Sequence, residues 1–183
     1  LQKEEIFTRE IFLEQAHRHR VCPFELCLDT ASWADNIICD YNYVFDPNVY
    51  LRRFFAEGTK EEYLFLVDEA HNLVERARSM YSAVLVKEDF LAVKKLVKPY
   101  SKKVAAELEK CNKILLAYKR ECEDYRICEN ISNFAFALMR FGAAADTFLQ
   151  KSTEFPGKKE FLDLYLKVRH FLNMYERLDE HYV

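Results

Sequence analysis

The chain is poor in glycine and proline, with 3 and 4 of them among 183 residues. Turn-rich all-β folds and low-complexity segments need more of both, so the long periodic stretches between these few breakers predict a mainly helical protein. No apolar run approaches the roughly 20 residues that a membrane-crossing helix requires, and no signal peptide opens the chain. We therefore expect a cytoplasmic protein that does not contact a membrane.

A regular cysteine framework is also lacking, although six cysteines are present. A chain of this length with 50% hydrophobic residues can form a core without disulfides, so we expect reduced thiols. Cys39, Cys111 and Cys122 are expected to be buried as small apolar side chains. Net charge is only −3, but residues 87–120 hold ten Lys/Arg and four Asp/Glu, a balance of +6. That asymmetry indicates a basic helical surface.

The most informative stretch that is present is residues 64–71, where four apolar residues run into Asp68-Glu69-Ala70-His71. A short apolar run of this kind predicts a strand buried on both faces, here Leu64–Val67. Ligands of parallel sheets collect at the carboxyl ends of the strands, where carboxylates suit a magnesium ion and an attacking water. The same four letters also fit an ordinary strand end before a helix, so the neighbouring motifs decide between the two.

Apolar periodicity organises the N-terminal part of the chain. Thr8 is expected to cap a first helix. A second short strand is expected over residues 36–41, followed by a helix that starts at Asp46-Pro47, presents Arg53 on an apolar face and stops at Gly58. With Leu64–Val67, these elements predict a strand–helix–strand unit with two parallel strands.

From about Ser82 onward the pattern predicts helices, with breaks at Pro99, Asn130 and Pro156-Gly157. Apolar residues recur at alternating spacings of four and three, as in packed helix pairs. The seam of the first long helix comprises Val104, Leu108, Cys111, Leu115, Tyr118, Cys122 and Tyr125. The predicted fold class is mainly α: an antiparallel helical bundle attached to a small strand–helix–strand piece of an α/β domain.

Three motifs follow one another in order: Cys22-Pro23-Phe24, then Asn42-Tyr43 with Phe45-Asp46-Pro47, then the Asp-Glu-Ala-His box. Over about residues 20–75, this order resembles the iron–sulfur helicases of the XPD/DinG family, in which a helical arch domain follows the box. The resemblance implies an ATP-dependent DNA helicase of superfamily 2 with 5′-to-3′ polarity. It divides the chain into the end of an iron–sulfur domain (1–35), part of a RecA-like motor domain (36–78) and the arch (79–183).

By position, the resemblance makes Asp68 and Glu69 the Walker B pair that serves Mg²⁺ and ATP. It makes His71 the residue that couples the nucleotide state to other motor motifs. The sequence has no G-x-x-x-x-G-K-[ST] phosphate loop and no second motor domain, so this piece alone is expected to be inactive. Because position 1 is Leu and not Met, we expect the chain to be a fragment.

The resemblance also makes Cys22 the fourth ligand of a [4Fe–4S] cluster. Such a cluster needs about four thiolates, so the intact enzyme is expected to hold it and this fragment to lose it. The alternative is a zinc site of His17, His19, Cys22 and Cys27, whose residue types suit that metal. The irregular spacing of these four favours solvated histidines over a zinc site.

Single-stranded or forked DNA is the partner that the resemblance implies. Arg18 and Arg20, beside the cysteine element, are candidate phosphate contacts, and Tyr41 and Asn42 are candidate contacts to DNA near unpaired bases. A second basic patch contains Lys94, Lys95, Lys98, Lys102 and Lys103. Solvated helix faces and packing around a strand are the ordinary alternatives. Protein partners on the arch and self-association through exposed strand edges are further expectations.

A different class of function stays open on the sequence alone. The chain is then a helical protein–protein interaction module, and its Asp-Glu-Ala-His is coincidental. A phosphate loop and three more cysteines encoded upstream in the gene would favour the helicase, and an initiator Met at this point of the gene would favour the module.

Overall fold

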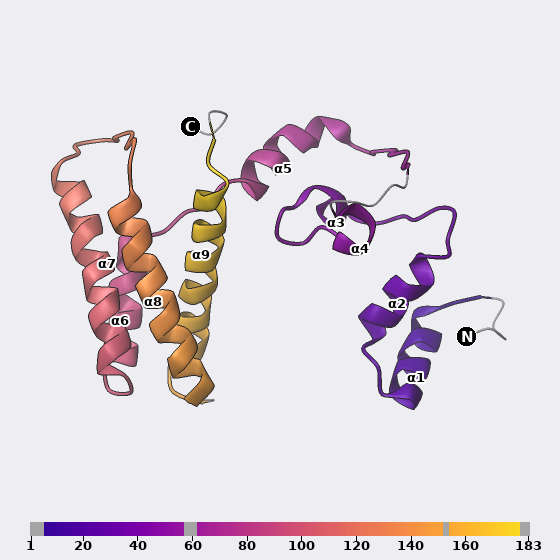
Figure 1. Cartoon of the computed structure of the whole chain (residues 1–183), viewed down its shortest axis with the longest axis horizontal. Helices are drawn as coiled ribbons and strands as arrows, with labels where there is room; N and C mark the ends of the chain where they lie inside the picture. The colour runs from indigo at the N-terminus through magenta and orange to yellow at the C-terminus, as the bar shows by residue number, and fades with distance from the viewer. Residues whose placement is uncertain (1–5, 57–61, 152–153, 180–183) are drawn as a thin grey trace. The chain divides into compact units, whose positions relative to one another are not determined.

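The computed structural model describes residues 6–56, 62–151 and 154–179. The chain divides into two compact units, Leu1–Val67 and Asp68–Val183, each held together by its own contacts. All regular elements within the described ranges are helices, which Figure 1 shows in order along the chain. None of these helices is long and apolar enough to cross a membrane.

The first unit begins with α1 (Arg9–His19) and α2 (Pro23–Ala31). The predicted cap of α1 is confirmed, because the Thr8 hydroxyl accepts a hydrogen bond from the amide of Ile11 at 3.4 Å. α1 ends at Arg20, which takes the left-handed conformation with φ 56°. α2 starts at Pro23, since the fixed φ of proline suits the first helical position.

Two single-turn helices, α3 (Asn42–Phe45) and α4 (Arg52–Phe55), replace the helix predicted from Asp46-Pro47 onward. The carboxylate of Asp46 accepts a hydrogen bond from the amide of Asn48 at 2.8 Å. This bond closes a local turn, so Asp46 is not the N-cap of a following helix. Short polar side chains favour such turns, which compete with the helix. The predicted stop at Gly58 lies outside the described residues.

The two predicted strands, residues 36–41 and Leu64–Val67, have no regular secondary structure, so that prediction is not confirmed. A strand is stabilised by ladder hydrogen bonds to a second strand, and no described residue supplies one to either segment. Leu64 and Leu66 are 89% and 91% exposed, whereas Phe65 between them packs its ring 5.9 Å from that of Phe55. The alternation typical of a strand is therefore present without the sheet.

The second unit contains the short turn η1 (Ala70–Asn72), α5 (Leu73–Met80) and four longer helices. The four are α6 (Lys87–Val97), α7 (Lys102–Arg120), α8 (Ser132–Lys151) and α9 (Lys158–Glu176). Contacts join α6 to α7, α7 to α8, α8 to α9, and α9 back to α6 (Figure 1). The predicted helical bundle is confirmed.

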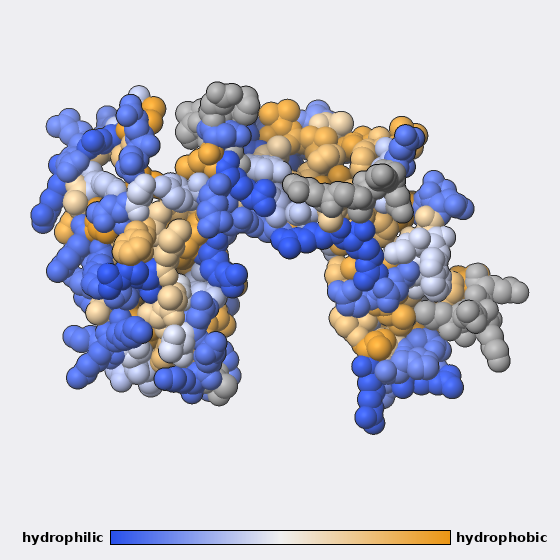
Figure 2. Space-filling model, in the orientation of Figure 1, coloured by the Kyte–Doolittle hydropathy of each residue, from blue (hydrophilic) through white to orange (hydrophobic). Residues whose placement is uncertain are grey.

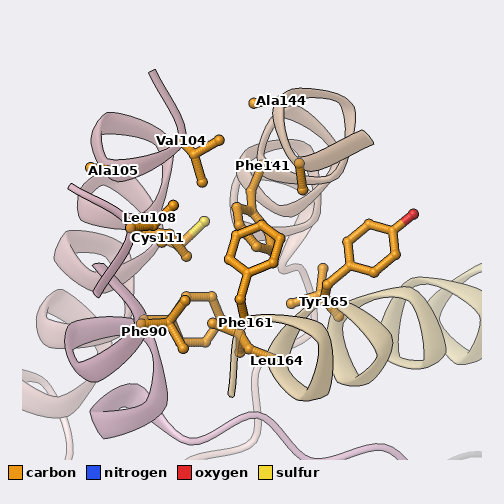
Figure 3. Packing of buried hydrophobic residues seen from close by; sticks show 14 of the residues in the cluster. Phe90, Val104, Ala105, Leu108, Cys111, Phe141, Ala144, Phe161, Leu164 and Tyr165 are labelled. Carbon is orange, nitrogen blue, oxygen red and sulfur yellow. The ribbon is translucent and has the colours of Figure 1, made fainter. Parts of the chain in front are cut away.

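The bundle core is aromatic and aliphatic. Phe141 of α8 and Phe161 of α9 are fully buried, with ring centroids 6.2 Å apart in an edge-on arrangement. In Figure 3 these two side chains lie in the middle of the cluster, between Leu108 of α7 and Tyr165 of α9. Full burial of such a side chain contributes roughly 1.5–3 kcal/mol to folding, so this layer accounts for much of the stability of the unit.

The predicted seam of α7 is right up to Tyr118 and wrong beyond it. Leu108 and Cys111 are fully buried, as expected, but α7 ends at Arg120. Cys122 is half-buried outside the helix, and Tyr125 is 85% exposed. Four charged residues lie around these two positions, and the chain turns there toward α8; they are Glu121, Glu123, Asp124 and Arg126. Cys39, predicted to be buried, is exposed because its strand does not form.

Candidate functional site

Asp68 and Glu69 lie in a tight turn directly before η1, and both are exposed. The Asp68 carboxylate accepts a hydrogen bond from the backbone amide of Glu69 at 2.9 Å. The carbonyl of Glu69 accepts a second one from the amide of Asn72, also at 2.9 Å. These two bonds hold the acidic pair at the start of a helical segment, with both carboxylates open to a ligand.

Glu69 takes the left-handed conformation, with φ 51° and ψ 38°. For a residue with a side chain this conformation costs roughly 1–2 kcal/mol, and strained residues of this kind cluster at functional sites. The two hydrogen bonds of the turn offset part of that cost. A strained backbone at the residue that the resemblance makes catalytic is a structural reason to regard this turn as the site.

His71 is brought to the same turn. Its Nε2 lies 3.4 Å from Oε2 of Glu69, and the side chains are 74% and 65% exposed. Solvent screens a pair this exposed, so the contact is loose and becomes an ion pair only when the imidazole is protonated. The three predicted residues therefore share one turn. Carboxylate oxygens are the ligands that Mg²⁺ prefers, and the exposed pair fits that chemistry.

Cys22, Arg18 and Arg20 lie around the junction of α1 and α2 in the first unit. Cys22 is the exposed residue directly before α2, Arg18 lies in the last turn of α1, and Arg20 ends that helix. An open pocket at this junction is lined by Leu13, Ala16, His17, Arg20, Val21 and Pro23. The two arginines are exposed and therefore accessible to a phosphate.

The described residues contain no group of three or more His, Cys, Asp or Glu side chains placed to hold a metal ion. His17, His19, Cys22 and Cys27 therefore do not form the alternative zinc site. A [4Fe–4S] cluster needs about four thiolates, and the described residues place no such set around Cys22. They do not fit a cluster by themselves.

Tyr41 and Asn42 are half-buried at the start of α3. The amide of Asn42 donates to the Asp40 carboxylate at 2.9 Å, which fixes the backbone there. The neighbouring Tyr43 places its ring 6.5 Å from that of Phe24 on α2. The structure thus brings the Cys-Pro-Phe element and the Asn-Tyr element of the sequence together within the first unit.

Arg53 is a positioning residue that the sequence pattern missed. It was predicted on an apolar helix face, but its guanidinium forms ion pairs with Asp29 and, at 3.2 Å, with Glu25. Both acids belong to α2, so this pair of contacts fastens α4 to the helix that follows Cys22. The signal in the sequence is the spacing of Glu25 and Asp29, which lie one helical turn apart on one face.

Comparisons with known proteins agree with this arrangement. Residues 1–90 match the protein family DEAD_2. The chain is 32% identical over 85 residues to a Regulator of telomere elongation helicase 1 homolog of Caenorhabditis briggsae, and equally to that of Caenorhabditis elegans. It is 26% identical over 110 residues to the ATP-dependent DNA helicase CHL1 of Kluyveromyces lactis.

These alignments cover 46% of this chain for the two Caenorhabditis proteins and 60% for the Kluyveromyces protein. They span only 8% and 13% of the relatives' own lengths. No solved structure matches the chain. The family match over residues 1–90 contains the cysteine element, the acidic turn and α5.

Proposed function

We propose that the chain is part of an ATP-dependent DNA helicase of superfamily 2. The proposal starts from the match of residues 1–90 to the DEAD_2 family. The resemblance to the XPD/DinG helicases is confirmed by this match and by relatives that are named as helicases. A coincidental Asp-Glu-Ala-His in an interaction module would not bring a match that begins at residue 1 and runs beyond the box. The helicase is therefore the preferred function.

The observation that carries the proposal is the exposed, strained turn at Asp68-Glu69 within the matched residues. In the intact enzyme, Asp68 would hold the Mg²⁺ that accompanies ATP, and Glu69 would orient or deprotonate the attacking water. Bound Mg²⁺ would neutralise charge on the phosphates. His71, 3.4 Å from Glu69, would link the state of that carboxylate to neighbouring motor elements.

The proposal assigns residues 1–35 to the end of an iron–sulfur domain, 36–78 to the motor and 79–183 to an arch whose helices run antiparallel. Residues 36–41 and 64–67 would become strands once a RecA-like sheet supplies their neighbours. The alternating exposure of Leu64, Phe65 and Leu66 supports this, because a central strand offers side chains to both faces. Unpaired segments of this kind would make the isolated chain self-associate.

Arg18 and Arg20 would contact the phosphates of single-stranded or forked DNA, with Tyr41 and Asn42 beside the strand. The exposure of the two arginines supports the first pair. Cys22 would supply one thiolate to a [4Fe–4S] cluster in the intact enzyme, and its exposed position at the start of α2 supports that role. Movement from 5′ to 3′, protein partners on the arch and a cytoplasmic location complete the proposal.

The test is Glu69→Gln in the full-length protein. ATP turnover should fall by at least about a thousandfold, because the water loses its orienting base, while ATP and DNA binding stay close to wild type. Glu75→Gln, an exposed carboxylate in the first turn of α5, is the matched control and should leave turnover unchanged. Normal turnover in Glu69→Gln would remove that residue from the catalytic role.

Two further measurements examine the other parts of the proposal. Cys22→Ser should bleach the visible absorbance of the cluster in the full-length protein, and an unchanged spectrum would show that another residue is the ligand. The 183-residue chain by itself should show no ATP turnover. Hydrolysis by the chain alone would contradict its assignment as an incomplete motor.

A further inference from the structure

Lysines gather at one end of the helical bundle. The turn between α6 and α7 and the turn between α8 and α9 both lie at this end, at the bottom of the bundle in Figure 1. We call this surface the lysine end. Its members are Lys94, Lys95, Lys98, Lys102 and Lys103 from the first turn, and Lys151, Lys158 and Lys159 from the second. The sequence shows two separate clusters, and only the fold joins them.

Two contacts hold the turns together. The ring centroids of Tyr100 and Phe155 are 5.8 Å apart, and Phe155 is buried against Phe148 and Phe161. Gly157 lies so close to Leu96 that a Cβ at that position would come 2.9 Å from Cδ1 of the leucine. The packing of the core therefore fixes the two clusters against each other.

Most of this charge is not neutralised by the protein. Lys94 pairs with Glu109 at 2.5 Å, and Lys158 pairs with Glu154 at 2.8 Å. The other six lysines are exposed and form no ion pair within the described part of the chain; they are Lys95, Lys98, Lys102, Lys103, Lys151 and Lys159. Glu160, in the first turn of α9, is a further acid close by in sequence. Hydrophilic side chains are frequent at this end in Figure 2.

The placement of four of these lysines works against helix stability. α7 opens with Lys102-Lys103 and α9 opens with Lys158-Lys159. The N-terminus of a helix carries partial positive charge and favours acidic residues, by roughly 0.3–1 kcal/mol each. Two helices that begin with paired lysines add their dipoles to a positive surface. This arrangement is unfavourable in the free protein and becomes favourable when an anion binds.

We propose that the lysine end is a second DNA-binding surface, which takes the phosphate backbone without reading its sequence. DNA is named as the ligand, in preference to other polyanions, because this inference rests on the proposed helicase function. The lysines lie near the ends of four helices. They are therefore spread widely enough to contact several successive phosphates, and too widely to bind a single small anion. A strand held here would be bound by the arch itself.

The experiment measures binding of the full 183-residue chain to fluorescein-labelled oligo(dT) by anisotropy at several salt concentrations. Lys98→Glu/Lys102→Glu should weaken binding about tenfold near 0.1 M salt. The slope of log K against log salt should become shallower by about 1.4, because each of the two lost phosphate contacts contributes ~0.7. Lys113→Glu/Lys119→Glu is the matched control, with the same charge change farther along α7. It should lose less than about threefold. Lys98→Arg/Lys102→Arg should bind as wild type does.

Equal losses in the two glutamate variants would show that only net charge matters, and they would overturn the proposal. So would unchanged binding in Lys98→Glu/Lys102→Glu with circular dichroism like that of wild type. Polyglutamate is then added at the same concentration of negative charges as the DNA. If it displaces the DNA, the lysine end binds anions in general, and its assignment as a DNA-binding surface is overturned. Arg18→Glu/Arg20→Glu separates the two proposals, because a loss in that variant alone supports the helicase contacts and rejects the lysine end.

Discussion

Glu107 of α7 and Arg140 of α8 form a hydrogen-bonded ion pair across the bundle, with Nη2 of the arginine 3.2 Å from Oε1 of the glutamate. Lys110 donates to the same oxygen at 2.8 Å. Glu107 is only 8% exposed, and its Oε2 is buried without a hydrogen-bond partner among the described residues. One carboxylate thus makes a polar link between two helices while part of it remains poorly solvated.

The first prediction compares the loss of the two cations with the loss of the Glu107 carboxylate, each measured as a change in the free energy of unfolding. Lys110→Ala/Arg140→Ala leaves a buried carboxylate with neither cation and should destabilise the protein by about 3 kcal/mol. Glu107→Met removes the buried charge and leaves two half-exposed cations that water can solvate, so it should cost less than about 1 kcal/mol. Urea unfolding followed by circular dichroism measures both. The reverse order of the two effects would contradict the argument.

The second prediction concerns acid. The hydrogen bond from Lys110 lowers the pKa of Glu107 from its usual 4.5, against the opposing effect of burial. Lys94 likewise lowers the pKa of Glu109. The unfolded chain binds these protons first, so the stabilisation is complete above the usual pKa and disappears as pH falls through the folded values. The urea midpoint should therefore drop below about pH 4.5, and Glu107→Gln should flatten that drop.

The third prediction compares two glycines of the bundle. Gly157 has φ +83°, and an added Cβ would crowd Leu96, so Gly157→Ala should destabilise by about 1–2 kcal/mol. Gly142 lies inside α8 with no atom within 4 Å of such a Cβ. Gly142→Ala should therefore stabilise the protein by about 0.5–1 kcal/mol, because it favours the helix. Thermal melts should move in opposite directions, and a common direction would contradict the geometry.

The fourth prediction concerns the thiols. Burial raises the pKa of Cys111 to about 12, with a further contribution from Glu107, and the side chain is fully buried. Its thiolate is therefore scarce and inaccessible in the folded protein. A thiol reagent at about pH 8 should modify the exposed cysteines first and reach Cys111 only on unfolding. The exposed ones are Cys22, Cys27, Cys39 and Cys128. Mass spectrometry of the labelled peptides would show early labelling of Cys111 if this is wrong.

The helices of the bundle could be predicted because their signals are local. Apolar residues at helical spacing, with breaks at Pro99 and Asn130, are sufficient to place α6 to α9 within a few residues. The strands could not be confirmed, since a strand depends on a partner elsewhere and residues 36–41 and Leu64–Val67 find none among the described residues. The helix predicted after Asp46 was lost to a local turn that the same letters also favour.

The candidate site divides in the same way. The order of motifs identified Asp68, Glu69 and His71, and their presence in one turn agrees with it. The left-handed backbone of Glu69 had no signal in the sequence, because nothing in the residue type demands a positive φ. The sequence also shows no sign that the two lysine clusters lie together. Their proximity depends on the contact between Tyr100 and Phe155, which are 55 residues apart in the sequence. Contacts between residues so far apart in the sequence are determined by how the helices pack, and the apolar spacing within one helix does not predict them.

The return of α9 to α6 has a mechanical consequence. His170 near the end of α9 lies 2.8 Å from the carbonyl of Ser82, just before α6 begins, so the chain leaves the bundle close to where it came in. A module with adjacent ends can be built into a host domain without pushing the flanking segments apart.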